Sequence, residues 1–281
     1  MIIWLASYPK SGNTWVRFFL KSYLSSPDKN LTLRPDIDDN FFIKNFPSAK
    51  LCDEMKIDYL NFHNIVKNWI PMQEFLNLNN KINFLKTHNA MCTINNYPFT
   101  NSNNTLGAIY IVRDPRDIVI SYADHFQVSH KEIVENMFSS EHGEAPTKNG
   151  KSYNLSIMGT WSDHYNSWKN FKKNYLLIKY ENLLYNPKEE FLKITKYLNL
   201  INGYKFEENK IMEAIENTKF SKLSNQEDLK GYIGNSPKNK ELEKKFFNLG
   251  PKNKWEDLLE GRVKDQIEKI FKEEMKELNY I

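Results

Sequence analysis

A short loop of charged and small residues, Tyr8-Pro9-Lys10-Ser11-Gly12-Asn13-Thr14-Trp15, follows the first apolar segment of the chain. That segment, Ile2 to Ser7, has the composition of a buried strand, and helical periodicity begins after the loop. A strand, a tight loop and a helix in this order point the unpaired N–H groups and the positive dipole end of the helix at the loop. The arrangement favours a bound anion such as phosphate.

Three residues of this loop suit a phosphate. Lys10 supplies a positive charge, Ser11 supplies a hydroxyl, and Gly12 lets the backbone approach closely. Compared with the Walker pattern G-x-x-x-x-G-K-[ST], Ser7 replaces the first glycine and Asn13 replaces the lysine. The displaced lysine argues against Mg·NTP chemistry. The alternative is a chance turn before a helix, and the position directly after a buried strand favours the functional interpretation.

A histidine follows the second predicted strand, in the run Lys86-Thr87-His88. Ligands of open α/β sheets collect at the carboxyl ends of the strands, so His88 and Lys86 are expected near the phosphate loop. A neutral imidazole there is suited to act as a general base near neutral pH. No comparable context surrounds the other histidines, which are His63, His125, His130, His142 and His164.

The third predicted strand runs into Val112-Arg113-Asp114-Pro115-Arg116-Asp117, with Ser121 two helical turns further on. The guanidinium of Arg113 offers a bidentate fork, and Ser121 a hydroxyl, for a second phosphate. The alternative is a capping and ion-pair cluster at the start of a helix. The two aspartates fit that cluster, whereas Arg113 is the better ligand candidate.

The elements that must position these residues alternate between strands and helices. Strands are predicted over Ile2–Ser7, Ile82–Lys86, Ala108–Val112 and Tyr175–Tyr180. Helices are predicted over Thr14–Ser25, Asp117–His130, Ser156–Phe171, Lys188–Leu198, Phe206–Asn217 and Val263–Leu278. This order favours an α/β fold with a central parallel sheet flanked by helices.

Two long stretches lack clean periodicity, Ser26–Met55 and Ser221–Asn253. In a compact domain such connections are functional lids or disorder, and residues 221–253 are expected to form a lid. No shift in composition marks a linker, so residues 1–281 are predicted to be one domain.

Composition excludes several classes of function. The net charge of +4 is too small and too dispersed to favour nucleic acid, and no apolar run approaches the ~20 residues of a membrane helix. Cys52 and Cys92 are too few for a disulfide framework or a cysteine zinc site. The N-terminus has no signal-peptide pattern. We therefore expect a cytoplasmic protein without nucleic-acid or membrane partners.

Taken together, these motifs resemble the sulfotransferases that use PAPS (3′-phosphoadenosine 5′-phosphosulfate), especially the cytosolic type, which have a fold like that of P-loop nucleotide kinases. The resemblance rests on the loop at 8–15, on Lys-Thr-His at 86–88 and on Arg113 with Ser121. It continues through Gly159 to Trp168, Leu177 to Leu183, Thr218-Lys-Phe220, Gly250 and Lys254-Trp255, in the right order. It covers nearly the whole chain.

The resemblance implies a role for each matching residue. The 5′-phosphosulfate would be held by Lys10, Ser11, Gly12, Asn13 and Thr14. The adenine would be surrounded by Trp15, Thr218 and Phe220, and Tyr180 would line the nucleotide pocket. The 3′-phosphate would bind Arg113 and Ser121. His88 would be the base on the acceptor hydroxyl, with Lys86 and Lys10 near the sulfuryl group.

One departure from the family concerns the 3′-phosphate. Where the family often has Arg-Lys-Gly, this chain has Asn248-Leu249-Gly250, so only Gly250 matches. Lys244 and Lys245 are nearby and are the candidates to replace the missing charges.

The sequence therefore predicts an enzyme that transfers a sulfuryl group from PAPS to a hydroxyl or amine of a small-molecule acceptor, by in-line displacement and without a metal. PAP (adenosine 3′,5′-bisphosphate) would be the product. One alternative is a P-loop kinase with Thr14 on Mg²⁺, which Asn13 and the lack of a strand ending in Asp disfavour. The other is a non-catalytic nucleotide-binding protein, which the presence of both Lys10 and His88 disfavours.

Overall fold

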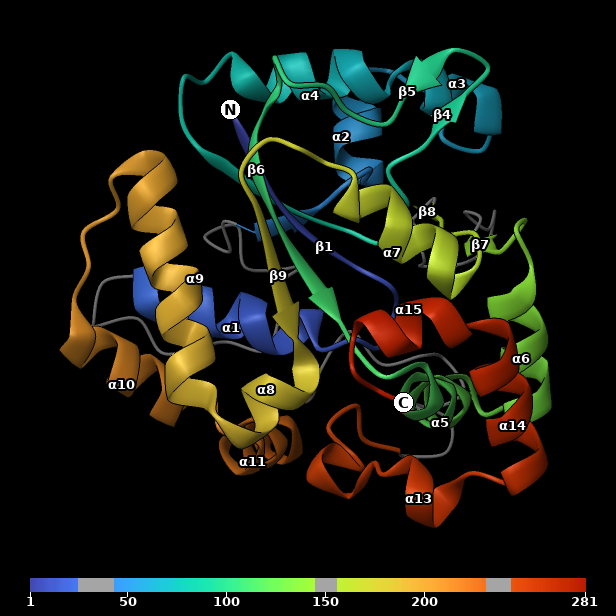
Figure 1. The fold of residues 1–281 in the computed structure, drawn as a ribbon. Coiled ribbons are helices and arrows are strands. Elements are labelled where there is room, and N and C mark those ends of the chain that lie inside the picture. The colour runs from blue at the N-terminus through green and yellow to red at the C-terminus, as the bar shows by residue number, and fades with distance from the viewer. Residues whose placement is uncertain (25–42, 145–155, 231–243) are drawn as a thin grey trace. The chain divides into compact units, whose positions relative to one another are not determined.

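The computed structural model describes residues 1–24, 43–144, 156–230 and 244–281. The described elements are drawn in Figure 1, and the chain divides into two compact units. Unit 1 comprises Met1–Tyr8, Phe42–Val112 and Met137–Leu177, and unit 2 comprises Pro9–Phe41, Arg113–Asn136 and Ile178–Ile281. The single domain over 1–281 remains a prediction.

The central sheet has five strands in the order β2-β3-β1-β6-β9. Their bounds are β1 Ile2–Ser7, β2 Ile43–Asn45, β3 Asn83–Thr87, β6 Thr105–Val112 and β9 Tyr175–Lys179. β1 pairs in parallel with both β3 and β6, and β2 pairs in parallel with β3. All six residues of β1 are buried, as its continuous apolar composition predicts. The predicted α/β class with a central parallel sheet is confirmed.

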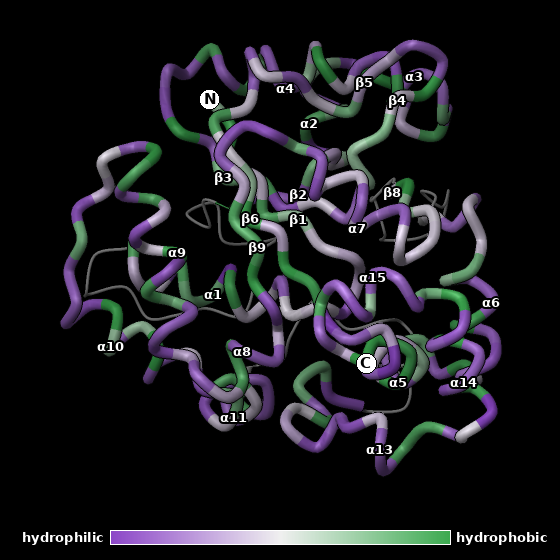
Figure 2. The backbone as a smooth tube through the Cα atoms, viewed as in Figure 1, coloured by the Kyte–Doolittle hydropathy of each residue, from purple (hydrophilic) through white to green (hydrophobic). Residues whose placement is uncertain are grey.

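In unit 1, the helices and short hairpins surround an aromatic core. The helices are α2 Ala49–Glu54, α3 Phe62–Lys67, α4 Trp69–Asn77 and α7 Trp161–Lys169, and the hairpins are β4 Thr93–Ile94 with β5 Tyr97–Pro98 and β7 Gly143–Glu144 with β8 Ser156–Ile157. The ring centroid of Trp4 in β1 lies 5.3 Å from that of Phe46 and 5.1 Å from that of Phe99. Its indole N–H donates to Thr105 Oγ1 at 2.9 Å. Figure 2 shows the hydrophobic colouring of β6 and β9 in the central sheet.

Unit 2 is mainly helical. Its helices are α1 Asn13–Leu24, α5 Pro115–Phe126, α8 Tyr180–Tyr185, α9 Pro187–Asn202, α10 Glu208–Asn217, α11 Phe220–Lys230, α13 Trp255–Leu258, α14 Gly261–Ile270 and α15 Lys272–Glu277, with a 3₁₀ turn at Gly250–Lys252. α6, His130–Phe138, begins in unit 2 and ends in unit 1. Pro187 is the first residue of α9, a position where the missing N–H of proline costs no hydrogen bond within the helix.

Several predicted boundaries were wrong. The helix predicted over Asp117–His130 ends at Phe126, because Gln127 is left-handed with φ of 56° and no glycine announces it. The helix predicted over Val263–Leu278 is interrupted at Phe271. Ser156 and Ile157 form β8, and their helix starts only at Trp161.

The two stretches predicted to be irregular contain regular elements in their described parts. β2 and α2 lie within the first, and α11 occupies Phe220–Lys230 at the start of the second. Residues 26–42 and 231–243 of these stretches, the latter in the predicted lid, lie outside the described residues.

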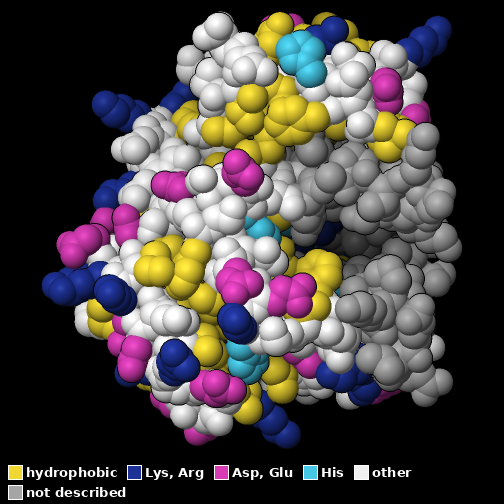
Figure 3. All heavy atoms as spheres, turned by 90° about the vertical axis from the view of Figure 1, so that its right-hand side faces the viewer, with side chains coloured by type: hydrophobic (Ala, Val, Ile, Leu, Met, Phe, Trp, Pro, Cys, Tyr) yellow, Lys and Arg dark blue, Asp and Glu magenta, His cyan; other side chains and the backbone are white. Residues whose placement is uncertain are grey.

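The surface agrees with the dispersed charge expected from the sequence. On the face drawn in Figure 3, basic and acidic side chains of the described residues are interspersed. Within the described part of the chain, none of the helices combines the length and apolar character needed to cross a membrane.

Candidate active site

The loop between β1 and α1 has an unusual backbone conformation. Lys10 and Gly12 both have positive φ, 64° and 94°. The N–H of Trp15 donates to the carbonyl of Gly12 at 3.0 Å, which starts the helix. A Cβ atom built on Gly12 would lie 2.4 Å from Cδ2 of Tyr180, so only glycine lets that ring lie against the loop. The loop and the first residue of α8 are therefore packed directly on each other.

Three buried donor groups around this loop have no hydrogen-bond partner among the described residues. They are the Ser11 hydroxyl, the indole N–H of Trp15 and Nε of Arg113. Ser11 is 1% exposed and Arg113 is 5% exposed. Because leaving a buried donor unpaired costs about 1–3 kcal/mol, a ligand that accepts hydrogen bonds from these groups would be stabilised here. Hydroxyl and guanidinium donors beside a helix N-terminus fit a phosphate or sulfate group.

Lys10 is the cation of the loop. Its Nζ lies 4.5 Å from the ring centroid of Phe246. Burial, and secondly the positive charge of Arg113, lower the pKa of Lys10 to about 8, whereas Asp124 acts in the opposite direction. A lysine whose charge is poorly solvated gains more from a bound anion than a fully hydrated one does. The electrostatics of the loop thus favour an anionic ligand.

Arg113, the residue after β6, is held by two contacts. Its Nη1 donates to the carbonyl of Lys10 at 3.0 Å, and its guanidinium carbon lies 4.2 Å from the ring centroid of Tyr180. Arg113, Lys10, Gly12 and Tyr180 therefore form one cluster in unit 2.

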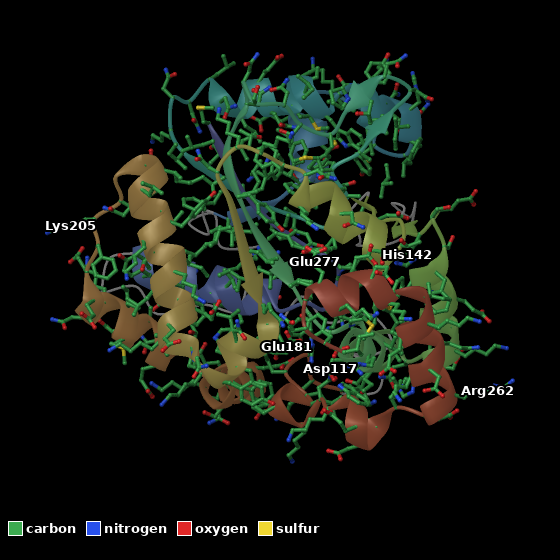
Figure 4. All side chains as sticks on the ribbon, viewed as in Figure 1. Asp117, His142, Glu181, Lys205, Arg262 and Glu277 are labelled. Carbon is green, nitrogen blue, oxygen red and sulfur yellow. The ribbon has the colours of Figure 1, made fainter. Side chains whose placement is uncertain are left out.

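The ion-pair cluster predicted as the alternative forms around Arg116 instead. Arg116 pairs with Asp114 at 2.6 Å and with Glu268 at 2.5 Å, and Asp114 caps α5 by accepting the N–H of Arg116. Asp117 does not cap α5; its carboxylate accepts the N–H of Trp255, the first residue of α13, at 2.9 Å. Burial raises the pKa of Asp117 to about 7. Figure 4 labels Asp117 on α5 and Glu181 on α8.

The predicted adenine residues lie on three elements of unit 2. The ring of Trp15 meets Tyr180 edge-on at 6.3 Å. Thr218 is fully buried at the end of α10, where its hydroxyl donates to the carbonyl of Ala214 at 2.7 Å. Phe220 opens α11 and lies so close to Gly250 that a Cβ there would be 2.4 Å from its ring. The structure thus pairs Trp15 with Tyr180, and Phe220 with Gly250.

The segment 244–250 is anchored by carboxylates. Lys244 Nζ and Asn248 Nδ2 both reach Asp124, each at 3.0 Å. Lys245 pairs with Asp228. The backbone N–H groups at 246 and 247 donate to the buried carboxylate of Glu227, at 2.6 and 2.8 Å. Both lysines considered as substitutes for the missing charges are therefore bound to acidic residues.

Sequence reasoning missed the groups that surround Lys10. Asp124 and His125 lie one turn beyond Ser121 on α5, and Phe246 comes from far along the chain. Burial, followed by the charge of Lys10, lowers the pKa of His125 to about 3. The only sign of these groups in the sequence was that Asp124 follows Ser121 by three residues.

The remaining predicted residues, Lys86 and His88, belong to unit 1. Lys86 lies in β3, whose register places it opposite Leu5 of β1. His88 follows β3, and its Nδ1 lies 2.7 Å from the carbonyl of Ser7. A carbonyl only accepts, so Nδ1 carries the proton and Nε2 carries the lone pair. A histidine that acts as a general base through Nε2 needs this tautomer.

Comparison with known proteins gives the family of this chain. Residues 2–279 match the sequence model of the sulfotransferase domain. The chain belongs to the sulfotransferase family. This is the family that the motifs of the sequence predicted.

Two relatives illustrate the similarity. Sulfotransferase 1 family member D1 of Mus musculus is 26% identical over 206 residues, 70% of this chain and 58% of the relative. Sulfotransferase 1B1 of Canis lupus familiaris is 24% identical over 274 residues, 96% of this chain and 82% of the relative.

Two crystal structures share the fold. Mouse sulfotransferase SULT7A1 complexed with PAP has a TM-score of 0.57 at 19% identity, covering 98% of this chain and 84% of that one. Retinol dehydratase in a complex with retinol and PAP has a TM-score of 0.58 at 20% identity, covering 98% and 81%.

Proposed function

We propose that this protein transfers the sulfuryl group of PAPS to a hydroxyl or amine of a small-molecule acceptor, and that it releases PAP. The single observation that carries the proposal is the cluster around the loop at 10–15. There, unpaired buried donors of Ser11, Trp15 and Arg113 surround a helix N-terminus and a lysine whose pKa is lowered to about 8. Two solved structures with this fold contain PAP.

The 5′ end of the nucleotide is assigned to the loop. Lys10 and Ser11, with the backbone N–H groups from Gly12 to Thr14, would hold the phosphosulfate. Positive φ, as at Lys10 and Gly12, is typical of the backbone turns in which N–H groups together bind an anion. PAPS supplies a sulfuryl group on a phosphate leaving group, so negative charge develops next to these donors. A single fixed donor aimed at such charge is typically worth about 3 kcal/mol.

The 3′ end is assigned to Arg113 and Ser121, with Gly250 as the close-approach position. Arg113 is buried and its Nε has no partner in the described structure, so it retains capacity to bind an anion. Asn248 and Leu249 add no charge there. We infer that recognition of the 3′-phosphate depends mainly on Arg113.

The adenine is assigned to the surroundings of Trp15, Thr218 and Phe220, with Tyr180 lining the pocket. The Thr218 hydroxyl is engaged with Ala214, so its contribution would be its methyl group and backbone. The aromatic rings of Trp15 and Phe220 offer faces on which a purine can stack.

The general base is assigned to His88. The Nδ1–H bond to Ser7 puts the lone pair on Nε2, which would take the acceptor proton, a contribution typically worth ~10²–10⁴ in rate. Lys86 and Lys10 would stabilise the charge on the sulfuryl oxygens. No metal is invoked in this scheme, since the lysines and the helix N-terminus supply the positive charge.

The acceptor is proposed to be a small molecule, because the solved retinol dehydratase structure is a complex with retinol and PAP. The cytoplasm is proposed as the setting, where Cys52 and Cys92 would stay reduced. The test is to incubate the protein with PAPS and a panel of alcohols, phenols, amines, sugars and lipids. Mass spectrometry should detect an acceptor that gains one SO₃ group. Phosphorylation of an acceptor with Mg·ATP instead would favour a kinase.

A further inference from the structure

We propose that Tyr110 and His164 are positioning residues that hold His88 in place from behind. The Tyr110 hydroxyl lies 2.8 Å from His164 Nδ1, and His164 Nε2 lies 3.1 Å from the backbone carbonyl of His88. The inference rests on the proposed function, in which His88 is the base.

The direction of each hydrogen bond in the series Tyr110–His164–His88 follows from its final acceptor, the His88 carbonyl. The His88 carbonyl can only accept, so His164 Nε2 must carry a proton and donate it. In a neutral imidazole Nδ1 is then an acceptor, and the Tyr110 hydroxyl must donate to it. The three groups are therefore locked in one arrangement, in which a phenol fixes the tautomer of one histidine and that histidine holds the main chain of another.

Burial keeps this arrangement constant with pH. Tyr110 and His164 are both 0% exposed. Burial lowers the pKa of His164 to about 3 and raises that of Tyr110 well above its usual value. Both groups thus stay neutral across the range in which enzymes work. Their contribution is to geometry and not to proton transfer.

The peptide that follows His88 is held by the same helix. Trp168, one turn beyond His164 on α7, donates its indole N–H to the carbonyl of Asn89 at 2.9 Å. Residues four apart on a helix share a face, so α7 presents both donors to one short segment. The side chain of Asn89 accepts the N–H of Ile157 at 2.9 Å. His88 is thus held through its ring by Ser7 and through its main chain by α7.

The packing around the pair opposes small displacements. The ring of Tyr8 meets that of His164 edge-on at 5.5 Å, and it stacks on His142 at 6.0 Å. Figure 4 labels His142. Tyr8 is also the residue before the phosphate loop's Pro9-Lys10. A shift of the base by about 1 Å can cost ~10² in rate, so this rigidity has a kinetic value.

The test compares His164→Leu, His164→Gln and Tyr110→Phe, with His63→Gln as a control at an exposed histidine of the same unit. Leu removes the donor to His88, whereas the amide of Gln places an N–H close to the original Nε2. We expect kcat to fall at least about tenfold in His164→Leu and to recover largely in His164→Gln. PAP affinity, measured by calorimetry, should be unchanged in all four variants.

Side-chain ¹⁵N chemical shifts of His88 give a readout that needs no acceptor. The Nδ1–H tautomer should dominate in the unmodified protein and in His63→Gln, and should be mixed with the other tautomer in His164→Leu. Equal kcat in His164→Leu and the unmodified protein would overturn the inference. So would equal losses in the Leu and Gln variants with a matching drop in Tm, because that pattern indicates packing alone. If His88→Ala itself retains full turnover, the proposed function has failed, and the ¹⁵N measurement still decides the positioning role.

Discussion

The guanidinium of Arg113 lies over the ring of Tyr180, 4.2 Å from its centroid, while the same ring lies against Gly12. One aromatic side chain thus joins the residue proposed for the 3′-phosphate to the loop proposed for the 5′-phosphosulfate. Three strand ends contribute to this contact, since Gly12 follows β1, Arg113 follows β6 and Tyr180 follows β9.

Replacing Arg113 by alanine should weaken PAP binding by at least about tenfold, which corresponds to 1.4 kcal/mol. A charged hydrogen bond to phosphate is worth roughly 1.5–3 kcal/mol. Binding of adenosine 5′-monophosphate, which lacks the 3′-phosphate, should scarcely change. Calorimetry with both ligands measures the difference, and Arg262→Ala, at an exposed arginine of the same unit (Figure 4), is the control. Equal losses for the two ligands would mean that Arg113 supports the fold or the 5′ end.

A change of Gly12 to alanine should abolish measurable PAP binding, because a Cβ would lie 2.4 Å from the Tyr180 ring and φ is 94°. Gly203→Ala is a matched control. Gly203 also has positive φ, 66°, in unit 2, but a Cβ there meets nothing within 4 Å. It should lower stability by about 1 kcal/mol and leave PAP affinity intact. Intact binding in Gly12→Ala would show that PAP binding does not depend on the packing of the Tyr180 ring against the loop.

The pH dependence of PAP binding should reveal Lys10. Its pKa is lowered to about 8, chiefly by burial, so its charge is present below pH 8 and is lost above it. Binding should therefore weaken between pH 7.5 and 9, by up to about tenfold if only the charged form binds. Lys10→Arg keeps its charge and should give a flatter profile. Asp117, with a pKa of about 7, is already ionised over most of this window. Affinity that is constant to pH 9 would contradict the role of Lys10.

Turnover should survive EDTA. In the proposed scheme Lys10, Lys86 and the helix N-terminus supply the positive charge that a metal supplies in kinases. The rate measured with PAPS should be the same with EDTA and with added Mg²⁺. A strict requirement for Mg²⁺ would favour the phosphoryl-transfer alternative, with Thr14 on the metal.

The sequence predicts the parts of this molecule that have strong local signals. β1 is six buried residues in a row, so its bounds were predicted to the residue. β2 was missed because it has only three residues, and Lys44 in its middle is exposed. The end of α5 was missed because Gln127 adopts the left-handed conformation there. A glycine at that position would have predicted a helix end, whereas a glutamine does not.

The candidate site, too, has some features that local sequence signals predict and others that they do not. The proximity of Arg113 to the loop follows from the rule that strand ends gather ligands, and the structure joins Arg113 to the Lys10 carbonyl. The anchoring of the segment around Phe246 by Glu227 and Asp124 depends on contacts between distant parts of the chain. The same is true of the bond between His164 and His88, 76 residues apart. Such contacts have no local pattern from which they could be predicted.

The most direct test of the account is the transfer of ³⁵S from labelled PAPS to an acceptor found in the panel, comparing the unmodified protein with His88→Ala. We predict that the unmodified protein labels the acceptor and forms PAP in equal amount. In His88→Ala the rate should fall by at least about a hundredfold, while PAP affinity measured by calorimetry stays the same. Label transfer at an undiminished rate in His88→Ala, or PAP formation without any labelled acceptor in the unmodified protein, would contradict the account.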